Sequence, residues 1–189
     1  MKLKELTDVK IGLSLERKKA NLASTNTINY KVLTLKSFVS SNKLEELPYE
    51  YFTASTEIGT QYLTKEGDVI VRLRSPNYAI FINNNNTGLI VSSLMAIITN
   101  IFPNVLDSKY LTYYLNSQCI QSKLVTQGTA IPMIKIVDLL ELDISLPTIE
   151  KQQKIVNYID AANQEIELLN KLTNEKNKLK TEIFETLIK

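Results

Sequence analysis

The sequence predicts an α+β protein, in which a mixed, β-rich domain precedes one long C-terminal helix that pairs as an antiparallel coiled coil. Before residue 147, apolar and polar residues alternate in several short stretches, as expected for half-buried strands. After Pro147 the chain has neither proline nor glycine, and its apolar residues recur three or four positions apart. The predicted domains are therefore residues 1–147 and residues 148–189.

The predicted C-terminal helix carries a seam of apolar residues suited to lie against another helix. At 1.5 Å per residue it is on the order of 58 Å long, well beyond an ordinary globular helix. The seam residues are Ile155, Ile159, Ala162, Ile166, Leu169, Leu172, Leu179, Ile183 and Leu187. Leu172 comes one step early and a polar stretch follows at 174–178, so we expect the two halves to face different neighbours. Local fraying or an exposed kink is the alternative.

Strands dominate the first hundred residues of the prediction. The predicted strands are 9–15, 30–35, 51–53, 69–74, 78–82, 89–99 and, later, 142–146. Gly12 suggests a bulge in the first of them. Residues 40–50 are predicted to be a polar connection. The asparagine-rich segment 83–88 is typical of a turn, although asparagine can also read adenine.

Helical spacing begins after Pro103. Asp107 or Ser108 can cap a first helix, Ser117 can cap a second, and a third is expected at 134–140. The tyrosines of the first helix could stack on bases, but their helical spacing favours core and rim positions.

Basic residues are concentrated near the N-terminus. The net charge is +2. Between residues 10 and 36, six cations are opposed only by Glu16, which makes this segment locally basic. Such a cluster is either a solvated face or a nucleic-acid contact.

Composition argues against an enzyme acting alone. The chain has no histidine, which removes the commonest general base and metal ligand, and five glycines leave little material for a phosphate-binding loop. We therefore expect no catalytic residue, no metal site and no cofactor. Cys119 is the single cysteine, the first residues do not resemble a signal peptide, and no apolar stretch would span a membrane. A cytoplasmic location is expected.

Two arginines share one face of the predicted strand 69–74. Arg72 and Arg74 would lie roughly 6.6 Å apart along the strand. Two guanidiniums at that spacing suit successive phosphates, or a phosphate and a base edge. An ordinary solvated strand face is the alternative.

Four segments resemble, in order and spacing, the specificity subunits of type I restriction-modification systems. They are 67–72 (GDVIVR), 110–117 (YLTYYLNS), 127–132 (QGTAIP) and 146–156 (LPTIEKQQKIV). The last resembles the segment that opens the family's long helix, except that Lys151 separates Glu150 from Gln152. A full-length subunit resembles two tandem copies of this unit, whereas this chain has one.

The resemblance implies a non-catalytic, sequence-specific subunit that binds double-stranded DNA. It implies docking to the modification (methyltransferase) subunit, which alone would use S-adenosylmethionine, and a restriction (motor-nuclease) subunit as an optional further partner. The expected DNA contacts are Arg72, Arg74, Arg17, Lys18, Lys19 and, from its place in a family loop, Thr129.

Three interpretations follow from one recognition domain and one helix. In the first, a homodimer forms through the C-terminal helix and reads a palindromic, bipartite site. In the second, a truncated or regulatory subunit binds the methyltransferase without directing modification. In the third, the chain is a coiled-coil adaptor with no DNA role.

Overall fold

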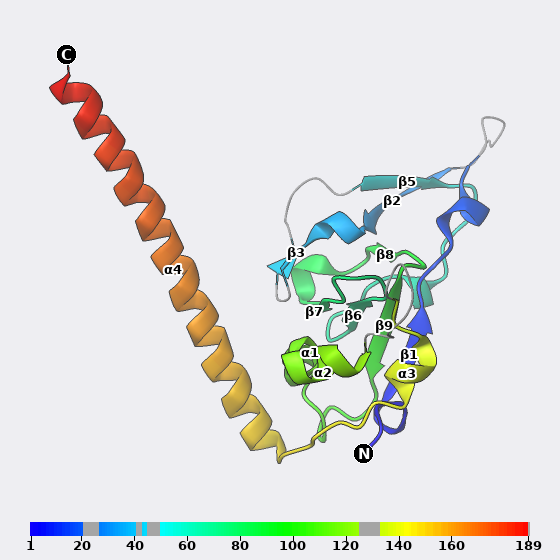
Figure 1. Ribbon diagram of the computed structural model, residues 1–189. Helices are drawn as coiled ribbons and strands as arrows, with labels where there is room; N and C mark the ends of the chain where they lie inside the picture. Colours follow the sequence, from blue (N-terminus) through cyan, green and yellow to red (C-terminus); the bar gives the residue numbers. More distant parts are fainter. Residues whose placement is uncertain (21–26, 41–42, 45–49, 125–132, 189) are drawn as a thin grey trace. The chain divides into compact units, whose positions relative to one another are not determined.

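The computed structural model describes residues 1–20, 27–40, 43–44, 50–124 and 133–188 (Figure 1). The chain divides into two compact units, Met1–Gln152 and Gln153–Lys189. The first unit contains strands and short helices, and the second is helical from Gln153 to Leu187. The predicted α+β class with a long C-terminal helix is confirmed; the pairing of that helix stays a prediction.

The larger sheet of the first unit has the strand order β1-β9-β6-β7, with every neighbouring pair antiparallel. Its strands are β1 (Thr7–Ile11), β6 (Val69–Arg72), β7 (Ala79–Phe81) and β9 (Met95–Asn100). Central strand β6 is buried on both faces, because Val69, Ile70 and Val71 are each at most 1% exposed. Its β-branched side chains suit such a position.

A smaller sheet has the order β5-β2-β8, in which β2 and β8 are parallel. Its strands are β2 (Ile28–Leu33), β5 (Glu50–Ala54) and β8 (Ile90–Val91). Strands β3 (Phe38–Ser40) and β4 (Lys43–Leu44) form a separate ribbon. One hydrophobic cluster joins all three sheets, since it includes Leu33, Phe38, Ile70, Val91 and Met95.

The expected strands at 9–15 and 89–99 are both shorter than predicted, for one reason. Residues 89–99 divide into β8 and β9, which belong to different sheets. Leu13 pairs with the chain between them: its N–H donates to the Val91 carbonyl at 2.7 Å, and its carbonyl accepts from the Ser93 N–H at 2.9 Å. A Cβ on Gly12 would lie 2.2 Å from the Ser92 carbonyl oxygen. Glycine is therefore required by a close crossing of two backbones.

Three short helices follow the sheets: α1 (Ser108–Asn116), α2 (Gln118–Leu124) and α3 (Ile136–Leu140). Asp107 caps α1, as predicted, by accepting a hydrogen bond from the Tyr110 N–H at 2.8 Å. Helix α1 packs on β7 and β6 (Figure 1). The predicted strand at 142–146 is wrong. Among the described residues, this segment forms one isolated bridge, between Lys2 and Asp143, and no strand. The hydroxyls of Tyr110 and Tyr114 also hold this segment, donating to the carbonyls of Ser145 and Asp143, both at 2.9 Å.

Asn116 at the end of α1 caps the outer edge of β7 at Ala79. Its Oδ1 accepts from the Ala79 N–H at 2.8 Å, and its Nδ2 donates to the Ala79 carbonyl, also at 2.8 Å. A side-chain amide thus supplies both hydrogen bonds that a neighbouring strand would make.

Helix α4 (Ile149–Leu187) has 39 residues. Its apolar side chains from Ile166 onward are exposed: Ile166, Leu169, Leu172, Leu179, Ile183 and Leu187 are all at least 50% accessible. Among the residues that the structure describes, no helix combines the length and hydropathy needed to cross a membrane.

Gly67 and Asp68, the pair that precedes β6, each have a structural role. Gly67 adopts a left-handed conformation with φ of 88°. The nearly inaccessible Asp68 carboxylate accepts from the Lys65 N–H at 2.9 Å and from the Thr99 hydroxyl at 2.9 Å. Burial, opposed in part by these hydrogen bonds, raises the pKa of this carboxyl above its ordinary 3.8.

We expect Asp68→Asn to alter the pH dependence of stability. Because the folded-state pKa is raised, the folded state binds the proton first as pH falls, so the contribution of Asp68 to stability increases from neutral pH down to 3.8. The amide can still accept from Lys65 and donate to Thr99. The variant should therefore be most stable, relative to the parent, at neutral pH, and lose that advantage toward pH 3.8. Urea unfolding of both proteins across this range measures the difference; parallel curves would contradict the prediction.

Candidate nucleic-acid interface

Arg72, the last residue of β6, is partly buried. Its guanidinium carbon lies 5.7 Å from the centroid of the Phe38 ring, and its Nη1 donates to the Leu35 carbonyl at 3.4 Å. Its Nε is inaccessible and has no hydrogen-bond partner among the described residues. Burial lowers the pKa of the guanidinium below its ordinary value. The solvated strand face considered as an alternative is therefore wrong for Arg72, since it shares its face of β6 with the core residue Ile70.

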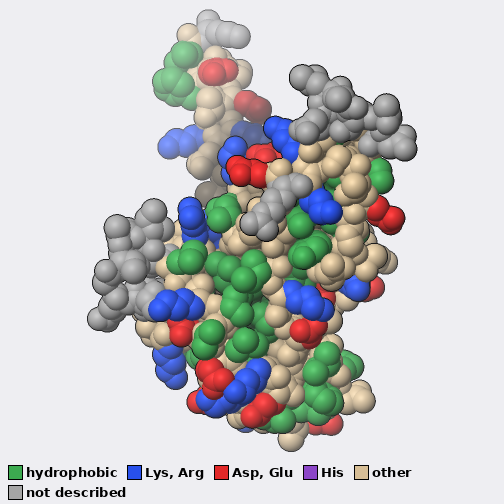
Figure 2. Space-filling view, turned by 90° about the vertical axis from the view of Figure 1, so that its right-hand side faces the viewer, with side chains coloured by type: hydrophobic (Ala, Val, Ile, Leu, Met, Phe, Trp, Pro, Cys, Tyr) green, Lys and Arg blue, Asp and Glu red, His purple; other side chains and the backbone are tan. Residues whose placement is uncertain are grey.

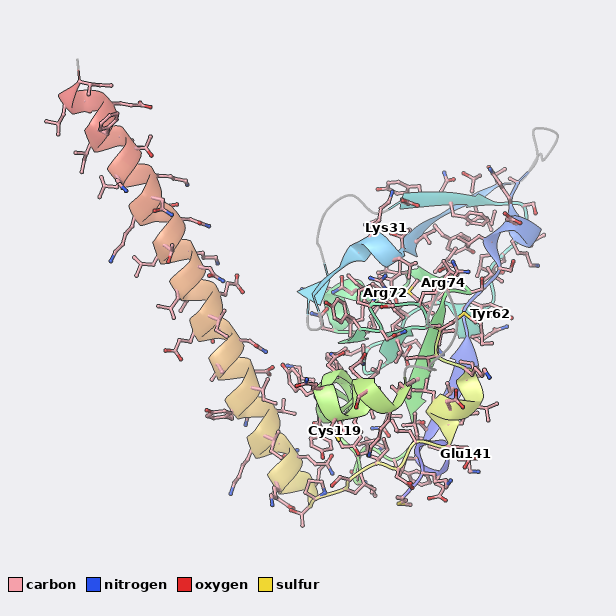
Figure 3. All side chains as sticks on the ribbon, in the orientation of Figure 1. Lys31, Tyr62, Arg72, Arg74, Cys119 and Glu141 are labelled. Atoms are coloured by element: carbon pink, nitrogen blue, oxygen red, sulfur yellow. The ribbon has the colours of Figure 1, made fainter. Side chains whose placement is uncertain are left out.

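Arg74 has a different environment two residues further on. It lies beyond the end of β6, where it forms an isolated antiparallel bridge with Met133, and it is exposed. The chain is held here through Leu73, whose N–H donates to the Leu94 carbonyl at 3.0 Å and whose carbonyl accepts from the Ile134 N–H at 2.8 Å. Figure 3 labels both arginines in the first unit. The two arginines are separated only by Leu73, yet Arg72 is partly buried and Arg74 is exposed.

Lys18 ends the short 3-10 helix Leu15–Lys18, and Lys19 is its C-cap. The Lys18 carbonyl accepts from the Ser55 N–H at 3.1 Å, and its Nζ donates to the Thr56 hydroxyl at 3.4 Å. Lys19 is exposed and bridges to Ala54, at the end of edge strand β5. This segment therefore places two lysines along the outer edge of the smaller sheet.

Two of the expected DNA contacts lie wholly or partly outside the described residues. Thr129 falls in 125–132, and only the backbone of Arg17 is described, within Leu15–Lys18. Both stay predictions.

The outer face of the smaller sheet adds residues that the sequence interpretation did not select. Lys31 on β2 lies opposite Tyr51 on β5, and Asn29 lies opposite Thr53. All four are exposed, and Tyr51 is 72% accessible. The alternation of 28–33, with Tyr30 and Val32 turned to the core, is the sequence signal that would have identified this face.

Acidic neighbours reduce the positive charge predicted for residues 10–36. Lys10 pairs with Asp8 at 2.6 Å, and Lys36 lies 3.6 Å from Glu50. In Figure 2, lysine and arginine side chains are scattered over the visible face among hydrophobic groups. Exposed pairs of this kind contribute little stability, so their lysines remain available to a polyanion.

Solved structures share this fold. The chain is similar to the HsdS subunit from Thermoanaerobacter tengcongensis, with 16% identity and a TM-score of 0.69 over 94% of this chain and 45% of that chain. It is similar to the type I restriction-modification S subunit from M. genitalium, with 22% identity and a TM-score of 0.58 over 96% and 43%. A chain from a study of complex assembly and conformational transition in a type I R-M system gives 20% identity and a TM-score of 0.64 over 93% and 40%. These similarities show that the chain shares the fold of these S subunits.

The match of the amino-acid sequence to a family identifies the family of this chain. Residues 1–178 match the family described as type I restriction modification DNA specificity domain, and the chain belongs to this family. The resemblance noted from four short segments is thereby confirmed. The chain spans less than half the length of each structural relative above, and no curated protein sequence matches it.

Proposed function

We propose that this chain is a non-catalytic DNA-recognition subunit of a type I restriction-modification complex. Its first unit would read one half of a bipartite target, and methyltransferase subunits bound to it would carry S-adenosylmethionine and perform the chemistry. Membership of the DNA specificity domain family over residues 1–178 is the observation that carries this proposal. A complex of this kind acts on cellular DNA, which implies a cytoplasmic location.

We infer further that two copies of the chain pair through α4 in antiparallel orientation. The exposed apolar side chains from Ile166 to Leu187 support this, because a helix of 39 residues with such a stripe is stabilised by a second helix. Two identical recognition units related by a two-fold axis would read two identical half-sites, so the target would be palindromic and interrupted.

Co-expression with the cognate methyltransferase subunit, followed by mapping of methylated bases, tests the function. The expected result is methylation at a palindromic, interrupted motif. A stable complex that adds no methylation would favour the regulatory alternative. If the chain binds neither DNA nor the methyltransferase, the remaining interpretation is a coiled-coil adaptor with no DNA role.

Charge reversal at Arg74 is expected to weaken DNA binding with a defined salt dependence. Removal of one phosphate contact lowers the slope of log K against log salt by about 0.9 per recognition unit, which corresponds to about eightfold in affinity at 0.1 M salt. Arg74→Glu should lose at least this much, because it also adds repulsion. Fluorescence anisotropy with duplex DNA at several salt concentrations measures both quantities.

Lys123→Glu on α2 is the matched control for Arg74→Glu. Lys123 is also exposed, and the substitution changes the net charge by the same amount. Equal losses in the two variants would mean that net charge, rather than a contact at Arg74, governs binding.

A further inference from the structure

The contacts of Arg72 converge on one turn of the chain. The 3-10 turn Leu35–Ser37 links β2 to β3 and is closed when the Phe38 N–H donates to the Leu35 carbonyl. The same carbonyl accepts from Arg72 Nη1, and the Phe38 ring lies beneath the guanidinium. Arg72 therefore binds both ends of this turn from a strand of the other sheet.

Lys36 lies at the centre of the turn that Arg72 holds. Its side chain is 90% exposed, and the exposed Glu50 carboxylate lies 3.6 Å from its Nζ. The turn is also closed from within, since Ser37 donates its N–H to the Thr34 carbonyl at 3.1 Å and accepts from the Thr34 N–H at 3.2 Å. Lys36 is therefore an exposed lysine on a short turn that hydrogen bonds hold in place.

Packing alone does not account for an arginine at position 72. The guanidinium is partly desolvated, and its inaccessible Nε has no partner among the described residues, which costs free energy. Methionine, with a chain of similar length, would fill the rim of this cluster without that cost. What arginine adds is the hydrogen bond to Leu35 and the cation–π contact with Phe38.

The same geometry limits a direct role in DNA binding. The side-on fork of arginine uses Nε, and this atom is covered. Nη1 is also engaged by Leu35. Exposed Arg74 has neither restriction.

The geometry points to Arg72 as a positioning residue that holds the turn Leu35–Ser37, so that Lys36 contacts a DNA phosphate. This inference rests on the proposed DNA-binding function. It assigns the two neighbouring arginines different roles: Arg74 binds the DNA backbone, whereas Arg72 acts through Lys36.

A double-mutant cycle with duplex DNA tests this assignment. Arg72→Met and Lys36→Met are each expected to weaken binding at 0.1 M salt by about eightfold per recognition unit, the value for one phosphate contact. If Arg72 acts through Lys36, the double variant should bind no more weakly than either single variant. Arg72→Met combined with Arg74→Met should instead be additive, at about sixtyfold. Additive losses for Arg72 and Lys36, or no loss in Arg72→Met, would overturn the assignment.

Hydrogen exchange in the absence of DNA gives an independent measurement. In Arg72→Met the amides of Ser37 and Phe38 should exchange faster, while Arg74→Met should leave them unchanged. Arg72→Lys should restore part of the protection, since an ammonium group can also donate to the Leu35 carbonyl. Unchanged exchange of these amides in Arg72→Met would show that Arg72 does not hold the turn Leu35–Ser37. If the parent protein fails to bind DNA but exchange is faster in Arg72→Met, the proposed function and the role of Lys36 are both overturned. The contact by which Arg72 holds the turn Leu35–Ser37 would still stand.

Discussion

Replacing Gln152 by leucine is expected to lower the free energy of unfolding of the first unit by about 3–5 kcal/mol. The Gln152 side chain is fully inaccessible. Its Oε1 accepts from the Asp107 N–H at 2.9 Å, and its Nε2 donates to the carbonyls of Val105 and Pro147, both at 2.8 Å. Leucine has a similar volume but leaves these three backbone groups without partners. Urea unfolding followed by circular dichroism measures the change.

The adjacent glutamine provides the control. Gln153 is exposed on the same helix, so Gln153→Leu should change stability by no more than about 0.5 kcal/mol. Similar losses for both substitutions would contradict the role given to the Gln152 network. The network also explains the departure noted in the family segment: Lys151 is exposed, whereas the glutamine that follows it makes the contacts.

Introducing a lysine at Leu169 is expected to dissociate the proposed homodimer. Burying a leucine contributes about 1.5–3 kcal/mol, and the dimer would lose two of them, so the dimer should dissociate at least about 100-fold more readily. Light scattering should then show the 21.5 kDa chain in place of a particle of about 43 kDa, twice that mass.

Gln164→Lys adds the same charge to another face of α4 and should leave the dimer intact. Gln164 is exposed and lies about 140° around the helix from Leu169, at 100° per residue. A parent protein that is monomeric at micromolar concentration would reject the homodimer without affecting the family assignment.

Features set by local sequence were predictable. The cap at Asp107, the asparagine-rich turn and α4 depend on residues within a few positions of one another. Strand β6 was likewise predicted from its apolar run, although it ends at Arg72 rather than at Arg74.

Features set by contacts between distant segments could not be predicted. The break between β8 and β9 depends on Leu13, almost eighty positions earlier in the chain. The environment of Arg72 depends on Phe38, and Gln152 is buried because Val105 and Asp107 reach it. A period-two pattern gives the face on which Arg72 lies, but not whether another segment covers that face.

The pairing of Asn116 with Ala79 also limits how this protein can associate with others. An open strand edge is a template on which another chain can add a strand, and that reaction underlies much edge-to-edge aggregation. At β7 the template is already occupied at Ala79, where an incoming strand would have to displace two hydrogen bonds of 2.8 Å. A single asparagine from α1 thus opposes strand addition at the start of this edge of the larger sheet.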